Sequence, residues 1–316
     1  MSEDAPEPKM SAAQRHKAKH AMAASPLAIA AAAVLAQQSE PAEEPRRPVP
    51  VVDASDDSSS TPRLSPAQRH RMKVLAAQAI DAAGAPSQGR APDRAETGPA
   101  ASAYDLLRAQ LGEDLRRVGD IKSIEAKIAA KREMIATYAD HVATVLATAA
   151  ETGKALQDEI FVTIMVWCFD CAVWDIGLTM AEHVLKFKLT LPERFQRTAP
   201  TLILEEVAEA AFAAKRQDQA FPLEVLQRAS ELTAREDIGD IVRAKAEKAM
   251  GIECRRLAET MEPGADGPAG GKAAMFDQAL KHFKRALALD DKVGVVKQIE
   301  QVTNLLKKEP APEPEA

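Results

Sequence analysis

The stretch Ile160–Trp174, IFVTIMVWCFDCAVW, holds only two residues that are not apolar, Thr163 and Asp170. A helix that is apolar nearly all round is buried, because none of its sides is suited to water. These residues therefore predict a central helix around which other helices pack, in a protein whose few aromatics and scarce β-branched alternation favour an all-α fold.

The residues on the C-terminal side of this stretch predict a layered domain of helical hairpins. Ala279, Phe283 and Ala286 have the spacing of the second helix of a tetratricopeptide hairpin, where small residues let two helices approach closely. We expect residues 153–307 to form this TPR-like domain and residues 308–316 to be a disordered tail. The expected helices are Asp175–Leu189, Ala199–Lys215, Phe221–Leu232, Ile238–Met261 and a pair within Ala274–Leu306 that turns at Asp290-Asp291.

On the N-terminal side, Ile121–Val145 carries the strongest periodic pattern in the chain. Its apolar residues recur at spacings of three and four, which is typical of a coiled coil or of the long hairpin of a helical bundle. Burial against other helices of the same chain gives the same pattern, but a seam rich in isoleucine favours pairing between chains. We assign residues 104–152 to a helical oligomerisation segment, with candidate contacts Ile121, Ile124, Ile128, Ile135, Tyr138 and Val142.

A short amphipathic helix with a basic side is predicted at Leu64–Ala79, LSPAQRHRMKVLAAQA. Ser65 and Gln68 have the spacing of a capping box, and Pro66 suits the first helical position, where no N–H is needed. The cations of this helix suit a phosphate backbone, and a solvated helix start has the same composition. Within residues 64–103, the candidate DNA-binding residues are Arg69, His70, Arg71 and Lys73.

The segment Met10–Ser25, MSAAQRHKAKHAMAAS, repeats this pattern, so Arg15 and Lys19 become further candidates for DNA contact. The remainder of residues 1–63 is rich in Pro, Ala, Ser and Glu, which predicts a disordered arm around this short basic helix. The apolar run Leu27–Ala36 is far shorter than the ~20 residues of a membrane span. We therefore expect no membrane partner.

Composition limits how the chain could contact nucleic acid. The net charge is −6, and residues 1–103 contain 12 acidic and 12 basic side chains, so the excess negative charge lies in the rest of the chain. A DNA contact must therefore come from local basic patches. The three cysteines are not placed for a disulfide scaffold, which favours a reducing cytoplasm. Cys168 and Cys171 lie within the apolar stretch, and we expect them to be buried packing residues.

Three stretches together resemble the small terminase subunits of peduovirus-type temperate tailed phages, also called terminase endonuclease subunits. They are SPAQRHRMK at Ser65–Lys73, the long stretch Val166–Ala211, and ALALDDKVGVVKQIEQV at Ala286–Val302. The resemblance implies an oligomer that binds concatemeric double-stranded viral DNA at a packaging site in the host cytoplasm. It also implies a partner, the large ATP-hydrolysing subunit, with which the protein cuts DNA and loads it into procapsids.

The endonuclease name implies Mg²⁺ held by clustered carboxylates. Glu205 and Glu209 are one helical turn apart with Glu206 adjacent, so Glu205 and Glu206 are the catalytic candidates. A solvated helix face balanced by arginines has the same pattern, and the sequence shows no recognisable nuclease motif and no other cofactor site. A TPR-like helical adaptor without a DNA role is the alternative function.

Overall fold

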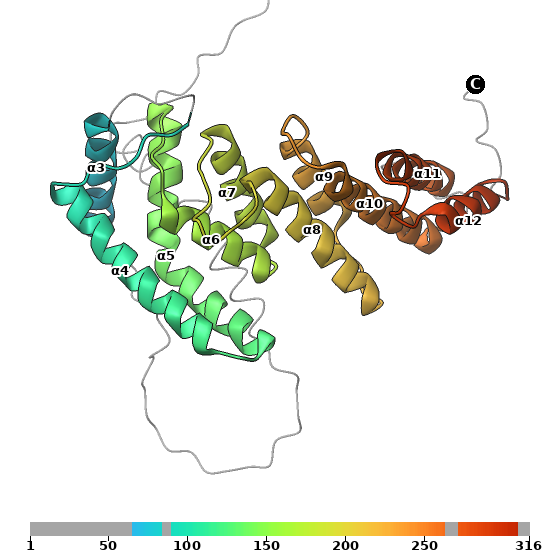
Figure 1. The fold of residues 1–316 in the computed structure, drawn as a ribbon, viewed down its shortest axis with the longest axis horizontal. Helices are drawn as coiled ribbons and strands as arrows, with labels where there is room; N and C mark the ends of the chain where they lie inside the picture. The colour runs from blue at the N-terminus through green and yellow to red at the C-terminus, as the bar shows by residue number, and fades with distance from the viewer. Residues whose placement is uncertain (1–64, 84–89, 263–270, 309–316) are drawn as a thin grey trace, which may run out of the picture.

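The structure, a computed structural model, describes residues 65–83, 90–262 and 271–308 and forms ten α-helices with no strand in those ranges. The all-α fold class is therefore confirmed. Figure 1 shows the helices arranged along one axis, with α3 at one end and α11 and α12 at the other. The helices are α3 (Pro66–Ala82), α4 (Pro99–Asp120), α5 (Ile124–Thr152), α6 (Glu159–Asp170), α7 (Trp174–Lys186), α8 (Ala199–Arg216), α9 (Leu223–Leu232), α10 (Asp240–Thr260), α11 (Gly271–Leu289) and α12 (Val296–Leu306).

The apolar residues from Ile160 to Phe169 form most of the central helix, α6. Every residue from Ile160 to Phe169 is buried, and α6 contacts α4, α5, α7 and α8. The helix ends at Asp170, earlier than predicted, because Ala172 takes a left-handed conformation with φ of 58°. That turn sends α7 back along α6, so the apolar stretch supplies a helical hairpin and not one continuous helix.

Two long helices precede the central one. α4 starts at Pro99 and runs through Gly119 to Asp120, because a glycine inside a helix costs only about 1 kcal/mol. The N-cap of α5 is Ser123, whose hydroxyl accepts from the Ala126 N–H. α5 ends at Gly153, which has a φ of 67°.

The buried apolar residues form two clusters. The larger one extends from α4 and α5 through α6, α7, α8 and α9 to the first half of α10. Residues 104–152 therefore share a core with the helices that follow them. The smaller cluster joins the second half of α10 to α11 and α12. Within the described ranges no helix is both long and apolar enough to cross a membrane.

The hairpin of α10 and α11 depends on a close approach at Gly251. A methyl group added there would lie 2.7 Å from the Phe283 ring, which is itself fully buried. Ala279 and Ala286 lie on the same side of α11 and are also fully buried. The small-large-small spacing recognised in the sequence thus packs α11 against α10, as in a tetratricopeptide hairpin.

We predict that Gly251→Ala lowers the free energy of unfolding by about 1–3 kcal/mol, the usual cost of overpacking a core. Gly112→Ala is the control, because it lies in α4 with nothing within 4 Å of an added methyl group. That change should raise stability by up to about 1 kcal/mol through helix propensity. Urea unfolding checks both, and equal effects at the two positions would contradict the close packing.

Candidate nucleic-acid interface

The predicted basic helix exists as α3 and has the predicted start. Gln68 N–H donates to the Ser65 hydroxyl at 3.3 Å, and the Ser65 N–H donates to the Gln68 side chain at 2.8 Å. The two bonds complete the capping box. Arg69, His70 and Arg71 follow on the first turns and are exposed. The cap thus holds these side chains on a formed helix end that faces water.

α3 is attached to the rest of the protein by a small contact. It packs on α4 and α5, and Ala79 is its only buried residue. Lys73 forms an ion pair with Glu151 of α5, and both side chains are about half exposed, so the pair contributes only ~0–1 kcal/mol. By contrast, Arg69 and Arg71 have no carboxylate within 4 Å among the described residues. Of the four predicted DNA contacts on α3, Lys73 is therefore the one engaged inside the protein.

The second predicted basic segment, with Arg15 and Lys19, lies outside the described residues. Its role stays a prediction.

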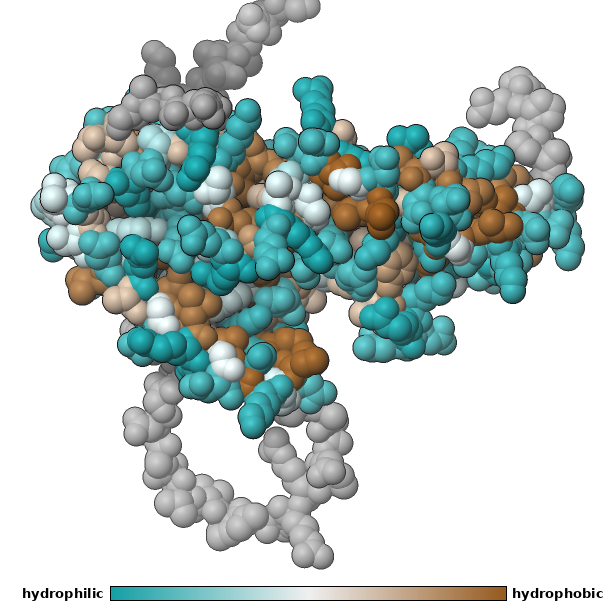
Figure 2. All heavy atoms as spheres, in the orientation of Figure 1, coloured by the Kyte–Doolittle hydropathy of each residue, from teal (hydrophilic) through white to brown (hydrophobic). Residues whose placement is uncertain are grey.

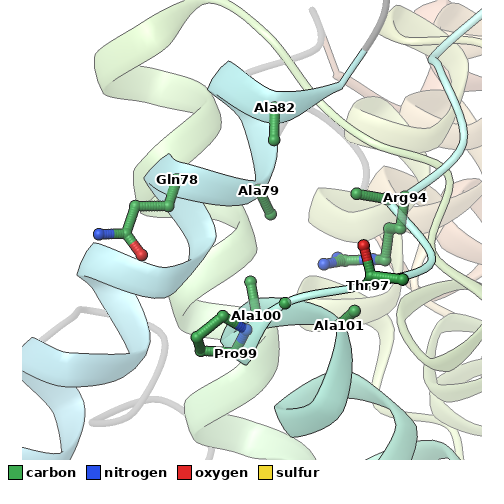
Figure 3. Close-up of a pocket in the computed structure, with 10 residues that line it drawn as sticks. Gln78, Ala79, Ala82, Arg94, Thr97, Pro99, Ala100 and Ala101 are labelled. Atoms are coloured by element: carbon green, nitrogen blue, oxygen red, sulfur yellow. The ribbon is translucent and has the colours of Figure 1, made fainter.

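A cavity of about 210 Å³ lies where α3 meets the start of α4. Figure 3 shows Gln78, Ala79 and Ala82 of α3 on one side and Ala100 and Ala101 of α4 on the other. Arg94 and Thr97, from the segment between the two helices, line the remaining wall. The walls are mostly methyl groups, so the cavity offers few polar contacts to a ligand.

Arg94 connects this region to a buried carboxylate that the sequence did not reveal. Asp158, which is fully buried, forms ion pairs with Arg94 and with His141 of α5, the latter at 2.9 Å. Its other oxygen accepts from the Tyr104 hydroxyl of α4 at 3.3 Å and from the Phe161 N–H at 2.9 Å. Asp158 is thus the N-cap of α6 and joins three further parts of the chain to it.

Electrostatics favour the charged form of this carboxylate. Burial alone raises the pKa of Asp158, but His141, Arg94 and the Phe161 N–H together outweigh it and hold the pKa below its usual range. Burial and the Asp158 charge in turn raise the pKa of Tyr104, so its hydroxyl stays a donor. Neither the burial of Asp158 nor its long-range partners were predicted from the sequence.

The predicted oligomerisation residues differ in how deeply they are buried. Ile135, Tyr138 and Val142 are buried in the core of their own chain, and the Tyr138 hydroxyl donates to Asp114 of α4 at 2.6 Å. Ile121 and Ile128 are partly buried against the same core. Ile124 is different, since 76% of its surface is exposed. Figure 2 shows apolar surface at the end of the molecule where α4 turns into α5.

The carboxylates predicted for catalysis lie on α8 and are paired with cations. Glu205 forms ion pairs with Arg197 and, at 3.7 Å, with Lys245, which also binds Glu209 at 2.8 Å. Partial burial and the charges of Asp170 and Glu205 raise the pKa of Glu206. Among the described residues, no group of three or more His, Cys, Asp or Glu is placed to hold a metal ion. The arrangement around Glu205 therefore does not fit Mg²⁺, and we derive no cleavage step from it.

The cysteine pair is buried, as expected. Cys168 and Cys171 are free thiols at most 1% exposed, and burial raises the pKa of Cys171 to about 11. A thiol with a raised pKa is a poor nucleophile and a poor metal ligand at neutral pH.

A family model and a similar protein of known name, both found by sequence comparison, agree with each other. A family model described as phage small terminase subunit matches residues 108–241, from α4 to the start of α10. The chain is 36% identical over 252 residues to a protein of Escherichia phage P2 named "Terminase, endonuclease subunit", covering 80% of this chain and 90% of that protein. No solved structure matches. α3 lies outside the residues that the family model matches.

We predict that Asp158→Asn lowers the free energy of unfolding by roughly 3 kcal/mol at pH 7, because it leaves Arg94 without its buried partner. The pKa of Asp158 is lower in the folded than in the unfolded chain, so the stabilisation is complete above about pH 4 and is lost as the pH falls toward the folded-state value. The difference between wild type and variant should therefore shrink on acidification.

Urea unfolding between pH 7 and pH 3 measures this difference. Asp105→Asn is the control, since Asp105 is exposed on α4 and forms no ion pair within the described residues. A penalty for Asp158→Asn no larger than that of the control would show that the carboxylate does not organise the fold.

Proposed function

The chain belongs to the family of phage small terminase subunits, and we propose on this basis that it binds double-stranded viral DNA at a packaging site. In this role it acts in the host cytoplasm with the large, ATP-hydrolysing subunit, and together they cut the DNA and load it into procapsids. The observation that supports DNA binding most directly is the exposed, capped start of α3, where two arginines have no ion-pair partner among the described residues.

The chemistry of this helix end suits phosphates. Each arginine carries a permanent charge and a planar set of N–H donors that fits phosphate oxygens. Because no carboxylate lies within 4 Å of Arg69 or Arg71 in the described ranges, binding DNA breaks no ion pair there. The small contact between α3 and the rest of the protein also lets the helix adjust its position on a duplex.

The net negative charge of residues 90–262 supports a DNA contact that is confined to a small part of the surface. Residues 90–262 contain 23 Lys and Arg against 29 Asp and Glu, so this part repels a duplex. The C-terminal helical domain, residues 153–307, is the proposed docking surface for the large subunit. The alternative, a TPR-like adaptor without a DNA role, shares the helical hairpins but gives no reason for a capped helix start that presents two exposed arginines to water.

We also propose self-association through the turn between α4 and α5. Ile135, Tyr138 and Val142 pack inside the chain, so a contact between copies would use the exposed end of the seam, where Ile124 projects into water. The exposed Ile124 and the partly buried Ile121 and Ile128 together form an apolar surface that a second copy could cover.

The relative from phage P2 is named an endonuclease subunit. For this chain we assign no cutting to Glu205 or Glu206, because Glu205 is held by two cations and Glu206 is partly buried beside it.

We predict that Arg69→Gln/Arg71→Gln weakens binding to a duplex roughly 10-fold and lowers the salt dependence, measured as −d log K/d log [salt], by about 2, since each phosphate contact contributes about 0.9. Mobility-shift titrations of the full chain at several salt concentrations measure both quantities.

The control is Lys188→Gln/Arg235→Gln, which removes the same charge from exposed positions that also form no ion pair among the described residues. Equal losses in the two variants would mean that net charge alone drives binding and would remove α3 from the interface. A wild-type chain that does not bind duplex DNA would favour the adaptor.

We predict that Ile124→Lys lowers the molar mass of the particle measured by analytical ultracentrifugation, because a charge would be buried at the proposed contact between copies. Leu106→Lys is the matched control, since Leu106 is 75% exposed but lies near the other end of α4. An assembly unchanged by Ile124→Lys would place self-association elsewhere.

A further inference from the structure

The segments that form α3 and the α11–α12 pair carry net positive charge, in contrast to the acidic part between them. Residues 65–83 contain three Lys and Arg against one Asp, and residues 271–308 contain eight against four Asp and Glu. α3 and the α11–α12 pair lie at opposite ends of the long axis (Figure 1). The α11–α12 pair is therefore a second region of positive charge, far from the first, although residues 309–316 that follow it contain three Glu.

One face of α11 concentrates these charges. Lys281, Lys284 and Arg285 are exposed and have the i, i+3, i+4 spacing of one helix face, while Ala279, Phe283 and Ala286 are buried toward α10 and α12. Lys281 is paired with Asp277 at 2.7 Å. No carboxylate in the described residues lies within 4 Å of Lys284 or Arg285. The centre of the face is thus uncompensated.

The segment that follows α11 is mixed in charge, with Asp290 and Asp291 ahead of its two lysines. Lys292, in the turn, and Lys297, on α12, are exposed and form no ion pair within the described part of the chain. Beside this turn, Lys248 of α10 donates to the Val293 carbonyl at 2.6 Å. Partial burial, followed by the charge of Lys215 on α8, lowers the pKa of Lys248.

We propose that the exposed face of α11, centred on Lys284 and Arg285, binds the phosphate backbone of double-stranded DNA as a second contact, separate from α3. This inference rests on the proposed DNA-binding function. A duplex presents one negative charge per about 1.7 Å of its axis, so unpaired cations within one helical turn of each other suit it. Contact through phosphates carries no base specificity, which fits a surface that holds DNA without selecting a sequence.

The composition of the face favours DNA over an acidic protein partner. Protein interfaces are anchored by buried aromatic or aliphatic side chains. The exposed large apolar residues of the described chain are Val74, Leu106, Ile124, Ile241 and Val296, and none of them lies on α11. A nucleic-acid backbone needs no such anchor.

The test is the variant Lys284→Gln/Arg285→Gln of the full chain, titrated against the same duplex over a range of salt concentrations. We expect the salt dependence to fall by about 2 and the affinity to fall roughly 10-fold. Both side chains are exposed, so the thermal unfolding midpoint should match that of wild type. Lys188→Gln/Arg235→Gln again controls for net charge.

The outcomes separate this inference from the proposed function. If Arg69→Gln/Arg71→Gln lowers the salt dependence and Lys284→Gln/Arg285→Gln does not, α3 is the DNA contact and the α11 face is not. Loss of large-subunit binding in the α11 variant with unchanged DNA binding would assign the face to a protein and overturn the inference. If the wild-type chain binds no duplex at all, both the proposed DNA-binding function and the inference about α11 fail.

Discussion

The buried carboxylate of Asp158 is the constraint on which the arrangement of the N-terminal helices depends. A charge without access to water is stable only when it is fully paired, and Asp158 takes its partners from Arg94, from His141 on α5, from Tyr104 on α4 and from the first turn of α6. Movement of any of these elements would remove one of the partners of a buried charge. The group therefore fixes α4 and α5 against the central helix, and these two helices form the surface on which α3 rests.

This arrangement separates a rigid body from the helix proposed to contact DNA. The central helices share a continuous core, whereas α3 buries a single alanine and is attached by an exposed ion pair. Elements with few buried contacts are the ones that adjust on binding. The net charge follows the same division, because residues 65–83 and 271–308 contain more Lys and Arg than Asp and Glu, while residues 90–262 between them contain fewer. Repulsion from that body would direct a duplex to the two ends.

Local chemistry made part of the fold predictable from the sequence. The all-apolar stretch predicted a buried α6, the Ser65 and Gln68 pair predicted the start of α3, and the Ala279, Phe283 and Ala286 spacing predicted the face of α11 that packs on α10. Long-range contacts were not predictable in the same way. Periodicity showed that Tyr138 and Val142 face something apolar but not that this is their own chain, and the sequence around Asp158 contains no sign of Arg94 or His141 as partners. The charges near Glu205 were recognised, but only the fold shows Lys245 of α10 beside it.

Hydrogen–deuterium exchange of the full chain, with and without a duplex, tests the central claim that DNA is bound at the basic ends and not on the acidic body. We expect slower amide exchange in α3 and α11 when DNA is present, reversed by high salt, and unchanged exchange in α7, α8 and α9. Protection confined to α7–α9, or no protection in α3 at a saturating concentration of duplex, would contradict the account.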